Sequence, residues 1–175
     1  MNTRTPASSR PPSAPAAPAA EAPHGPLHWR QLVTWLLSDG VITLEDGKRV
    51  AQRFGAGDSA QHPLVRLGGA GLVHAKTGVA LDVEGLTEWL AGHCQLPYLR
   101  IDPLKVDVAR VADVMSASYA ERRRALPLQV GATEALVATC EPFDVDWLPQ
   151  VEAHTRKTIK LALASPPEIQ RYTTE

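Results

Sequence analysis

Residues 96–107, LPYLRIDPLKVD, divide the chain into two parts with different patterns. Pro97 and Pro103 each push the residue before them out of helical geometry, so the segment between them is expected to be a brief strand or extended connector. The sequence before this stretch has a helical rhythm, and the sequence after it alternates between helix and strand. We therefore predict a helical module at residues 27–95 and an α/β unit at residues 96–175, with a hinge between them.

Composition excludes several classes of protein. A chain of 175 residues can form one ordinary domain or two small ones, and its 44% hydrophobic content is enough for a core. The net charge of −1 gives no overall attraction to nucleic acid or acidic membranes. No apolar run approaches the roughly 18 residues of a membrane helix. The N-terminus carries Arg4 and Arg10 but no apolar segment, so it is not expected to be a secretory signal.

The two cysteines, Cys94 and Cys140, form neither a disulfide framework nor a metal-binding spacing. They are expected to be reduced, partly buried thiols in a cytoplasmic protein. The histidines lie far apart in the sequence, and no nucleophile has a local partner that would activate it. We predict no metal site and no catalytic residues.

The first 26 residues differ in composition from the rest of the chain. They contain seven prolines and seven alanines, with no aromatic or β-branched apolar residue. Such a segment cannot bury enough surface to offset its ordering entropy. Residues 1–26 are therefore expected to be a disordered spacer that is dispensable for folding, with a proline-motif ligand as the alternative.

The predicted helical module begins with apolar residues at the helical period: Trp29, Leu32, Val33 and Leu36. Gly40 fits just past the end of that helix. Thr43 is placed to cap a second helix that reaches Phe54. The two helices are expected to form a hairpin.

A similar pattern follows 38 residues later. Gly40-Val41-Ile42 precedes one predicted helix and Gly78-Val79-Ala80 precedes another, and a further glycine follows seven residues after each first glycine. The later helix carries the apolar stripe Leu86, Trp89 and Leu90 and ends near Gly92. The two segments are either an internal repeat or two amphipathic helices that are similar by chance.

Between these segments lies HPLVRLGGAGL, residues 62–72. Its glycines allow positive φ angles and a close backbone approach. Arg66, just before them, could lay a planar guanidinium on a guanine or a phosphate. No lysine-serine or lysine-threonine pair follows, so the segment is not a phosphate-binding loop of the ATPase type. The alternative is a glycine-rich turn with a solvated arginine.

Beyond the hinge, helices alternate with strands. Asp107 is placed to cap one helix, and Ser118 with Glu121 has the spacing of a capping box for a short helix that ends in three arginines. Cations suit a helix C-terminus, and no aromatic residues interleave with them as in a nucleic-acid patch. Asp146 is placed to cap a later helix with Pro149 in its first turn.

Strand signals complete the second unit. Strands are expected at residues 126–130, 135–139 and 159–163, the first two joined around Gly131. Ser165, Pro166 and Glu168 supply the start of a last helix. The predicted order is helix, helix, strand, strand, helix, strand, helix. The fold class is therefore α+β: a helical module followed by a small α/β sandwich, with helices on a three- to four-stranded mixed sheet.

Four segments in this order carry a resemblance to a known family: LPYLRIDPLKVD at residues 96–107, AERRRALPL at 120–128, ALVATCEPFD at 135–144 and ASPPEIQRY at 164–172. Together they resemble the N-terminal region of the type II secretion and type IV pilus assembly ATPases, the GspE/PilB family. The resemblance covers residues 96–175, and residues 29–93 resemble the upstream module of the same proteins more loosely. In one branch of the family that module binds cyclic di-GMP through repeated Arg-Leu-Gly patterns.

The resemblance implies a docking and regulatory role. The expected partners are the cytoplasmic domain of an inner-membrane secretion or pilus platform protein and the ATPase domain of the same longer protein, with the chain in the cytoplasm at the inner-membrane face. The motor's phosphate-binding loop, acidic boxes and metal-binding cysteines are not in this sequence, so we expect no ATP hydrolysis. No cofactor is expected, and cyclic di-GMP is the possible regulatory ligand. The candidate ligand residues are Arg66, Leu67, Gly68 and Leu72. A nucleic-acid-binding adaptor is disfavoured by the balanced charge.

Overall fold

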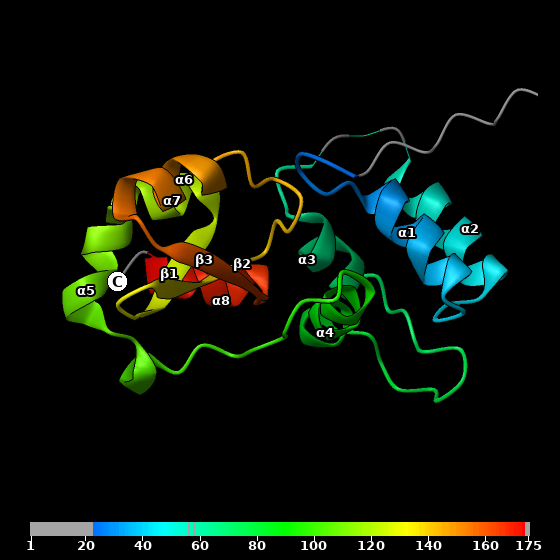
Figure 1. The fold of residues 1–175 in the computed structure, drawn as a ribbon. Helices are drawn as coiled ribbons and strands as arrows, with labels where there is room; N and C mark the ends of the chain where they lie inside the picture. The colour runs from blue at the N-terminus through cyan, green and yellow to red at the C-terminus, as the bar shows by residue number, and fades with distance from the viewer. Residues whose placement is uncertain (1–22, 56, 58, 174–175) are drawn as a thin grey trace, which may run out of the picture.

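The computed structural model describes residues 23–55, 57 and 59–173, which form two parts that lie side by side (Figure 1). The first part, here named the helical module, contains α1 (Trp29–Ser38), α2 (Leu44–Phe54), α3 (Pro63–Gly68) and α4 (Val83–His93). The second, the α/β domain, contains η1 (Pro103–Lys105), α5 (Val108–Val114), α6 (Ala117–Arg123), β1 (Ala125–Val130), β2 (Glu134–Thr139), α7 (Leu148–Thr155), β3 (Thr158–Leu163) and α8 (Pro166–Thr173). The order of α5 to α8 in the α/β domain confirms the one predicted for that unit, whereas α3 and η1 were not predicted. Within these residues, no helix is long and apolar enough to cross a bilayer.

The sheet has three strands in the order β1-β2-β3. β1 and β2 run antiparallel, while β2 and β3 run parallel and pair Glu134 with Thr158 through Thr139 with Leu163. The sheet is therefore mixed, as the sequence predicted. The parallel pair needs a crossover connection, which α7 supplies.

Two apolar layers cover the sheet because alternate residues of each strand point to opposite faces. Ala135 and Val137 of β2 pack with α5, α6 and α7 around Trp147. Ala138, the next residue along, packs on the other face with α8 through Ile169. The α/β domain thus has two small cores built entirely from its own residues.

The helical module has a single core, which is closed by a residue from the sheet. Leucines from α1, α3 and α4 form the centre of this core and are fully buried: Leu32, Leu36, Leu64, Leu67, Leu86 and Leu90. Leu163, the last residue of β3, belongs to the same core, and Tyr98 and Phe143 pack against it. The α/β domain therefore forms one wall of the helical module.

Local capping explains where most helices start. The Thr43 hydroxyl accepts from the Asp46 N–H at 3.2 Å, as predicted, and Gly40 has a φ of +69° just past α1. The capping box predicted at Ser118 is wrong. The Ser116 hydroxyl instead accepts from the Tyr119 N–H at 3.3 Å, because Met115 is buried in an extended conformation and α6 begins directly after it.

Two further cap predictions need correction. Asp146 does not cap α7: Trp147 holds that position, without a side-chain hydrogen bond. Glu168 does not reach back to its own helix start, although the Ser165 hydroxyl does accept from the Glu168 N–H at 3.4 Å. The Glu168 carboxylate instead accepts from the Ile101 N–H at 2.9 Å, so it ties the hinge segment to α8.

The predicted hinge is extended, as expected, but it is fastened along the sheet. Tyr98 forms a parallel bridge with Leu163. The Leu99 N–H donates to the Leu163 carbonyl at 3.0 Å, and the Leu163 N–H donates to the Pro97 carbonyl at 2.7 Å. The connector therefore acts as a short extra strand beside β3.

The described residues test two other expectations only in part. Gly40 and Gly78 are 38 residues apart, and both have a φ of +69°. The distance along the chain between the helix caps that follow them, Thr43 and Asp82, is one residue longer. The internal repeat therefore stays a hypothesis. The prediction of a disordered arm covers residues 1–26, of which residues 1–22 lie outside the described residues. Just after them, the Gly25 N–H donates to the Phe143 carbonyl at 3.0 Å, so the chain is attached to the α/β domain from that point.

Candidate functional site

The segment predicted to be a glycine-rich ligand turn is mostly helix. Residues 63–68 form α3, which starts because the His62 ring caps it and Pro63 takes the first helical position. Arg66 lies in the last turn of this helix, with its side chain half-buried. The predicted glycine-rich turn is confined to residues 69–71, where Gly71 has a φ of +72°, and the helix before it was not predicted.

The other three candidate ligand residues serve the interior of the module. Leu67 and Leu72 are 0% and 1% exposed and belong to the core. A Cβ on Gly68 would lie 2.8 Å from the Val83 backbone nitrogen, so the glycine is needed for the close contact between α3 and α4. Of the four candidates, Arg66 alone offers a charged group to a ligand, and their part in ligand binding stays a prediction.

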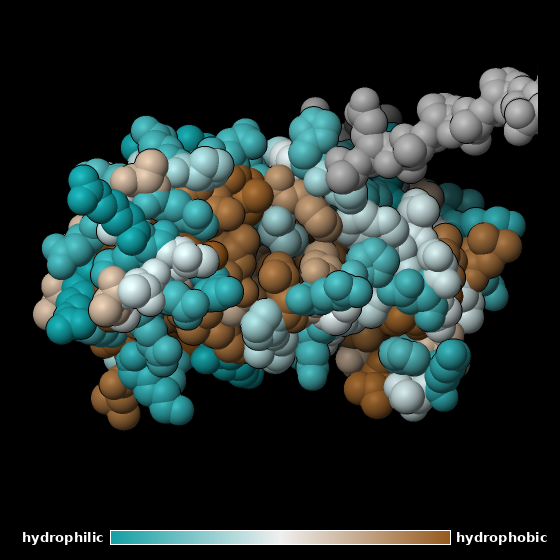
Figure 2. All heavy atoms as spheres, in the orientation of Figure 1, coloured by the Kyte–Doolittle hydropathy of each residue, from teal (hydrophilic) through white to brown (hydrophobic). Residues whose placement is uncertain are grey.

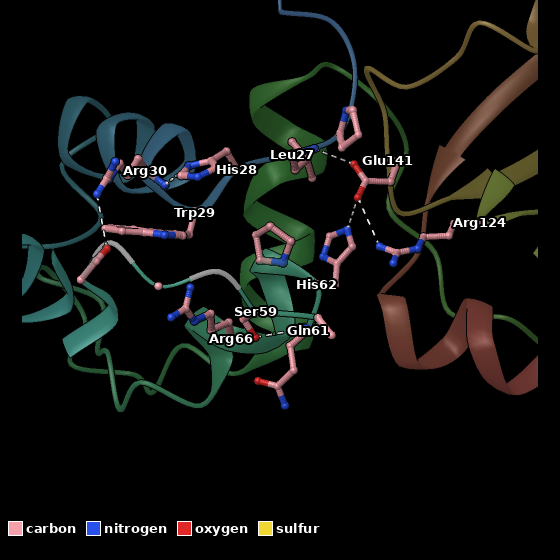
Figure 3. Close-up of a pocket in the computed structure, with 15 residues that line it drawn as sticks. Leu27, His28, Trp29, Arg30, Ser59, Gln61, His62, Arg66, Arg124 and Glu141 are labelled. Carbon is pink, nitrogen blue, oxygen red and sulfur yellow. Dashed lines mark hydrogen bonds and ion pairs between the residues drawn. The ribbon is translucent and has the colours of Figure 1, made fainter. Parts of the chain in front are cut away.

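Arg66 lines a cavity of about 290 Å³ between the helical module and the α/β domain (Figure 3). Arg30 from α1 and Arg124, which follows α6, line the same cavity. Its wall also includes the rings of His28 and Trp29, together with polar residues that precede α3. We name it the seam cavity, because residues from both parts of the molecule surround it.

Arg30 and Arg66 are held against the C-terminal end of α2. The Arg66 guanidinium lies 4.1 Å from the centre of the Phe54 ring, and its Nη2 donates to the Phe54 carbonyl at 3.3 Å. The Arg30 Nη2 donates to the Gly55 carbonyl at 3.3 Å. These carbonyls have no partner within the helix, and cations are favourable at this end of a helix. The half-buried Arg66 and the exposed Arg30 are thereby both attached to this end of α2.

Glu141 is a buried carboxylate at the edge of the seam cavity (Figure 3). Its Oε2 accepts from the Leu27 N–H at 2.8 Å, and its Oε1 lies 2.8 Å from the Nε2 of buried His62. The Nδ1 of His62 accepts from the Leu64 N–H at 3.1 Å, so the ring proton lies on Nε2, facing the carboxylate. The Arg124 Nη1 lies 3.5 Å from the same Oε1 and supplies the opposite charge.

A second carboxylate, Glu84 of α4, also joins the two parts. It accepts hydrogen bonds from the hydroxyl groups of Tyr98 and Ser165, both of which belong to the α/β domain. Burial raises the pKa of Tyr98 well above its ordinary value, and the neighbouring Glu84 raises it further, so this hydroxyl stays a donor at neutral pH. The helical module is thus attached through two acidic residues, Glu84 and Glu141.

An apolar groove of about 340 Å³ lies on the α/β domain, away from the seam cavity. Residues from α5, α6, β1 and α8 line it, among them Val111, Met115, Leu126 and Tyr172. Leu104 is 93% exposed in η1, and Val108 of the groove wall is 73% exposed. Figure 2 shows hydrophobic side chains protruding beside polar ones at this end of the molecule, over η1. Exposed apolar surface of this kind marks interaction sites.

Neither metal chemistry nor thiol chemistry finds support in the part of the chain that the structure describes. No group of three histidine, cysteine or acidic residues there is placed to hold a metal ion. Burial raises the pKa of Cys94 to about 11 and is the main cause that raises the pKa of Cys140 to about 12, so both stay protonated at neutral pH. Both thiols are free, as the sequence predicted.

The sequence analysis did not predict most of the residues that line the seam cavity. Arg30, Arg124, His62 and Glu141 come from four distant parts of the sequence, and no spacing relates them. One signal was available: His28 and His62 each precede a helix, and each accepts from a backbone N–H two residues later through Nδ1. Glu141 also falls inside the family-like segment 135–144, directly after a strand.

Comparisons with known proteins agree with this fold. Residues 94–175 match the family model of the MshEN domain. The chain is 39% identical over 102 residues to the type IV pilus assembly ATPase TfpB of Acinetobacter baylyi, a match that covers 58% of this chain and 17% of that protein. Among solved structures, MshE with cdg superposes with a TM-score of 0.59 at 17% identity, over 82% of this chain and 96% of that one. The N-terminal domain of XpsE superposes with a TM-score of 0.51 at 18% identity, over 82% and 91%.

Proposed function

We propose that this chain, which carries the N-terminal domain of a type II secretion or type IV pilus assembly ATPase, docks the motor of that longer protein onto an inner-membrane platform protein. The family resemblance seen in the sequence is confirmed by the MshEN match and by the pilus ATPase relative. The chain spans only 17% of that relative's length, so the motor of such a protein lies outside the matched part. We expect the chain itself to hydrolyse no ATP.

The apolar groove of the α/β domain is the observation that carries the docking proposal. A leucine at 93% exposure and a valine at 73% cost free energy in water, and covering apolar surface returns about 25 cal/mol per Å². The occupant to which we commit is the cytoplasmic part of the platform protein, because a motor that acts on a membrane assembly has to be held at the membrane face. Docking of this kind would keep the chain peripheral to the membrane.

Calorimetry with the cytoplasmic domain of the cognate platform protein tests the proposal. The variant Leu104→Asp/Val108→Asp places one charge on the groove wall, at Val108, and one on η1 beside the groove, without disturbing a buried side chain. Leu44→Asp/Val79→Asp is the matched control, because those side chains are 65% and 64% exposed on the helical module. We expect the groove variant to bind at least tenfold more weakly and the control to bind like the wild type. Equal affinities for the two variants, or no binding by the wild type, would contradict docking through the groove.

A second candidate function is a receptor for cyclic di-GMP. Two observations favour it: Arg66 lines a cavity, and MshE, which shares the fold, was solved with cdg. If Arg66 contacts the ligand, Arg66→Ala removes a charged hydrogen-bonding group worth about 1.5–3 kcal/mol, which is roughly tenfold to over a hundredfold in affinity. Titration of the wild-type chain with cyclic di-GMP decides this candidate, and no binding at high micromolar ligand would rule it out.

A further inference from the structure

His62 lies at the boundary between two cavities. Among the described residues it is the one buried histidine, at 6% exposure. It lines the seam cavity and also a second cavity of about 500 Å³, whose walls include residues of α3, α6 and α8. Arg124 lines both cavities as well. The His62 ring is therefore part of the partition that separates them.

Both ring nitrogens of His62 are occupied in the folded chain. Nδ1 accepts from the Leu64 N–H at 3.1 Å and so caps α3, and Nε2 lies 2.8 Å from the Glu141 Oε1 (Figure 3). A neutral imidazole carries one proton, which lies here on Nε2, and a second proton can be added only to Nδ1. A charged ring would then direct an N–H at the Leu64 N–H. Protonation is therefore incompatible with the position that the ring holds.

The charges around His62 do not compensate a charged ring. The ionisable side chains that line the two cavities with it are His28, Arg30, Arg66, Glu121, Arg124 and Glu141. Three of these are arginines and two are acids, while α8 contributes only uncharged side chains. Glu141 attracts a positive ring, but Arg124 lies 3.5 Å from the same carboxylate oxygen and already offsets its charge. A buried charge without a partner of its own is costly.

We propose that His62 is a pH-sensitive switch of the seam. The neutral ring caps α3 and joins the helical module to Glu141. Protonation at Nδ1 releases the ring from the partition, which removes the cap of α3 and connects the two cavities. On the side of the helical module, the Glu141 carboxylate then keeps only its contact with the Leu27 N–H. The seam is therefore weaker in acid.

The direction of the pH response follows from where the proton binds. The released ring can take up a proton and the held ring cannot, so the opened state binds more protons than the closed one. The population of the opened state therefore increases as the pH falls. A free imidazole changes its charge between about pH 5 and pH 8, so one such proton raises the opening constant by about tenfold from pH 7.5 to pH 5.5. The inference depends neither on docking through the apolar groove nor on a nucleotide ligand.

Urea unfolding of the full chain at pH 7.5 and at pH 5.5 tests the proposal. His62→Asn keeps an acceptor for the Leu64 N–H, since asparagine is a favoured N-cap residue, and it cannot take up a proton. We expect the unfolding constant of the wild type to rise about tenfold more between the two pH values than that of His62→Asn. His24→Asn, which removes an exposed imidazole outside both cavities, is the control and should follow the wild type.

NMR of the wild-type chain carries the test if His62→Asn does not fold. The nitrogen chemical shifts of the His62 ring should show a protonated Nε2 and an unprotonated Nδ1 at pH 7.5. At pH 5.5, protonation of Nδ1 should be accompanied by weaker protection of the Leu64 amide from hydrogen exchange, because that amide has lost its acceptor.

Three results would overturn the proposal. The first is equal pH dependence of the wild type and His62→Asn. The second is a wild type that gains stability in acid relative to His62→Asn, which would show that the attraction of Glu141 governs the ring. The third is a doubly protonated ring at pH 5.5 with the Leu64 amide still protected. The groove variant Leu104→Asp/Val108→Asp should keep the pH response of the wild type, so failure of docking and failure of the switch are distinguishable.

Discussion

The helical module and the α/β domain differ in how each completes its core. The α/β domain packs both faces of its sheet with its own side chains, centred on Trp147 on one face and Ile169 on the other. The helical module has one core, and that core includes Leu163 of β3 with Phe143 and Tyr98 packed against it. The difference indicates unequal independence: the α/β domain can support itself, while the helical module needs the α/β domain as a wall.

The contacts that join the two parts are polar as well as apolar. Glu141 and Glu84, one from each part, both accept hydrogen bonds across the seam. A buried carboxylate is costly unless its partners are present, so these contacts specify one arrangement of the parts more than they add stability. The MshEN match covers residues 94–175, which is the part with complete cores.

The largest expected effect is from Trp147→Ala in the α/β domain. Trp147 is 1% exposed at the centre of one core, and truncation of such a side chain costs about 3–5 kcal/mol. We expect both parts to lose stability, because the helical module loses its wall. Of the four tryptophans, the three that remain lie in the helical module, so their fluorescence during urea unfolding reports on that part. Helical-module unfolding at the wild-type urea concentration would contradict the dependence.

Leu64→Ala is the converse test. Leu64 is fully buried in the core of the helical module, and its truncation costs about 3 kcal/mol. We expect α1 to α4 to unfold at lower urea while the three strands keep their amide signals in a heteronuclear NMR spectrum. Leu104→Ala, at an exposed position, should change stability by less than about 0.5 kcal/mol. Simultaneous loss of the strand signals would show that the parts are equally dependent.

A smaller effect is expected from Glu141→Ala at the seam. The substitution leaves the Leu27 N–H without its acceptor and removes the carboxylate that lies 2.8 Å from the His62 Nε2, which costs about 2–3 kcal/mol. Glu121→Ala, an exposed acid on α6, is the control and should be near neutral. Thermal unfolding should become less cooperative in Glu141→Ala, with the helical module melting first. A single unchanged transition would mean that the seam contributes little to joining the parts.

The smallest effect concerns pH. The hydrogen bond from the His93 ring holds the pKa of Asp39 below its ordinary value of 3.8, helped by the Trp89 indole and opposed by burial. A carboxyl whose pKa is lowered by folding stabilises the fold above its unfolded pKa and loses that contribution as the pH falls below it. The difference in melting temperature between wild type and Asp39→Asn should therefore shrink from pH 7 to pH 3. The difference in melting temperature between wild type and Asp113→Asn, at an exposed position, should stay constant over the same pH range. Equal pH dependence of the two variants would contradict the assignment of the effect to Asp39.

The strands of the α/β domain could be predicted because alternation is a local signal. Ile159, Leu161 and Leu163 recur every second residue, and each lies in β3 as expected. The caps at Ser118 and Asp146 were misplaced because the same side chains could cap at neighbouring positions, and burial of Met115 and Trp147 decided between them. Tertiary packing therefore set the exact helix starts.

The candidate site could be predicted only in part, since it exists only after folding. The sequence indicated Arg66 beside its glycines, but it did not predict α3, which forms because the His62 cap and Pro63 start a helix there; the turn is limited to residues 69–71. Arg124 and Glu141 reach the same cavity from the far side of the hinge. No period or motif in the sequence brings these positions together, because the seam arises from packing of one part on the other.

Hydrogen–deuterium exchange of the wild-type chain tests the unequal independence of the two parts most directly. Amides of β1 to β3 should exchange only through global unfolding, while amides of α1 and α2 should exchange through a partial opening of lower free energy. In Trp147→Ala, the difference in opening free energy between the strands and these helices should decrease, because both parts depend on the core that Trp147 fills. Equal protection of helices and strands in the wild type, with the same dependence on urea, would contradict the account and show that the chain folds as one unit.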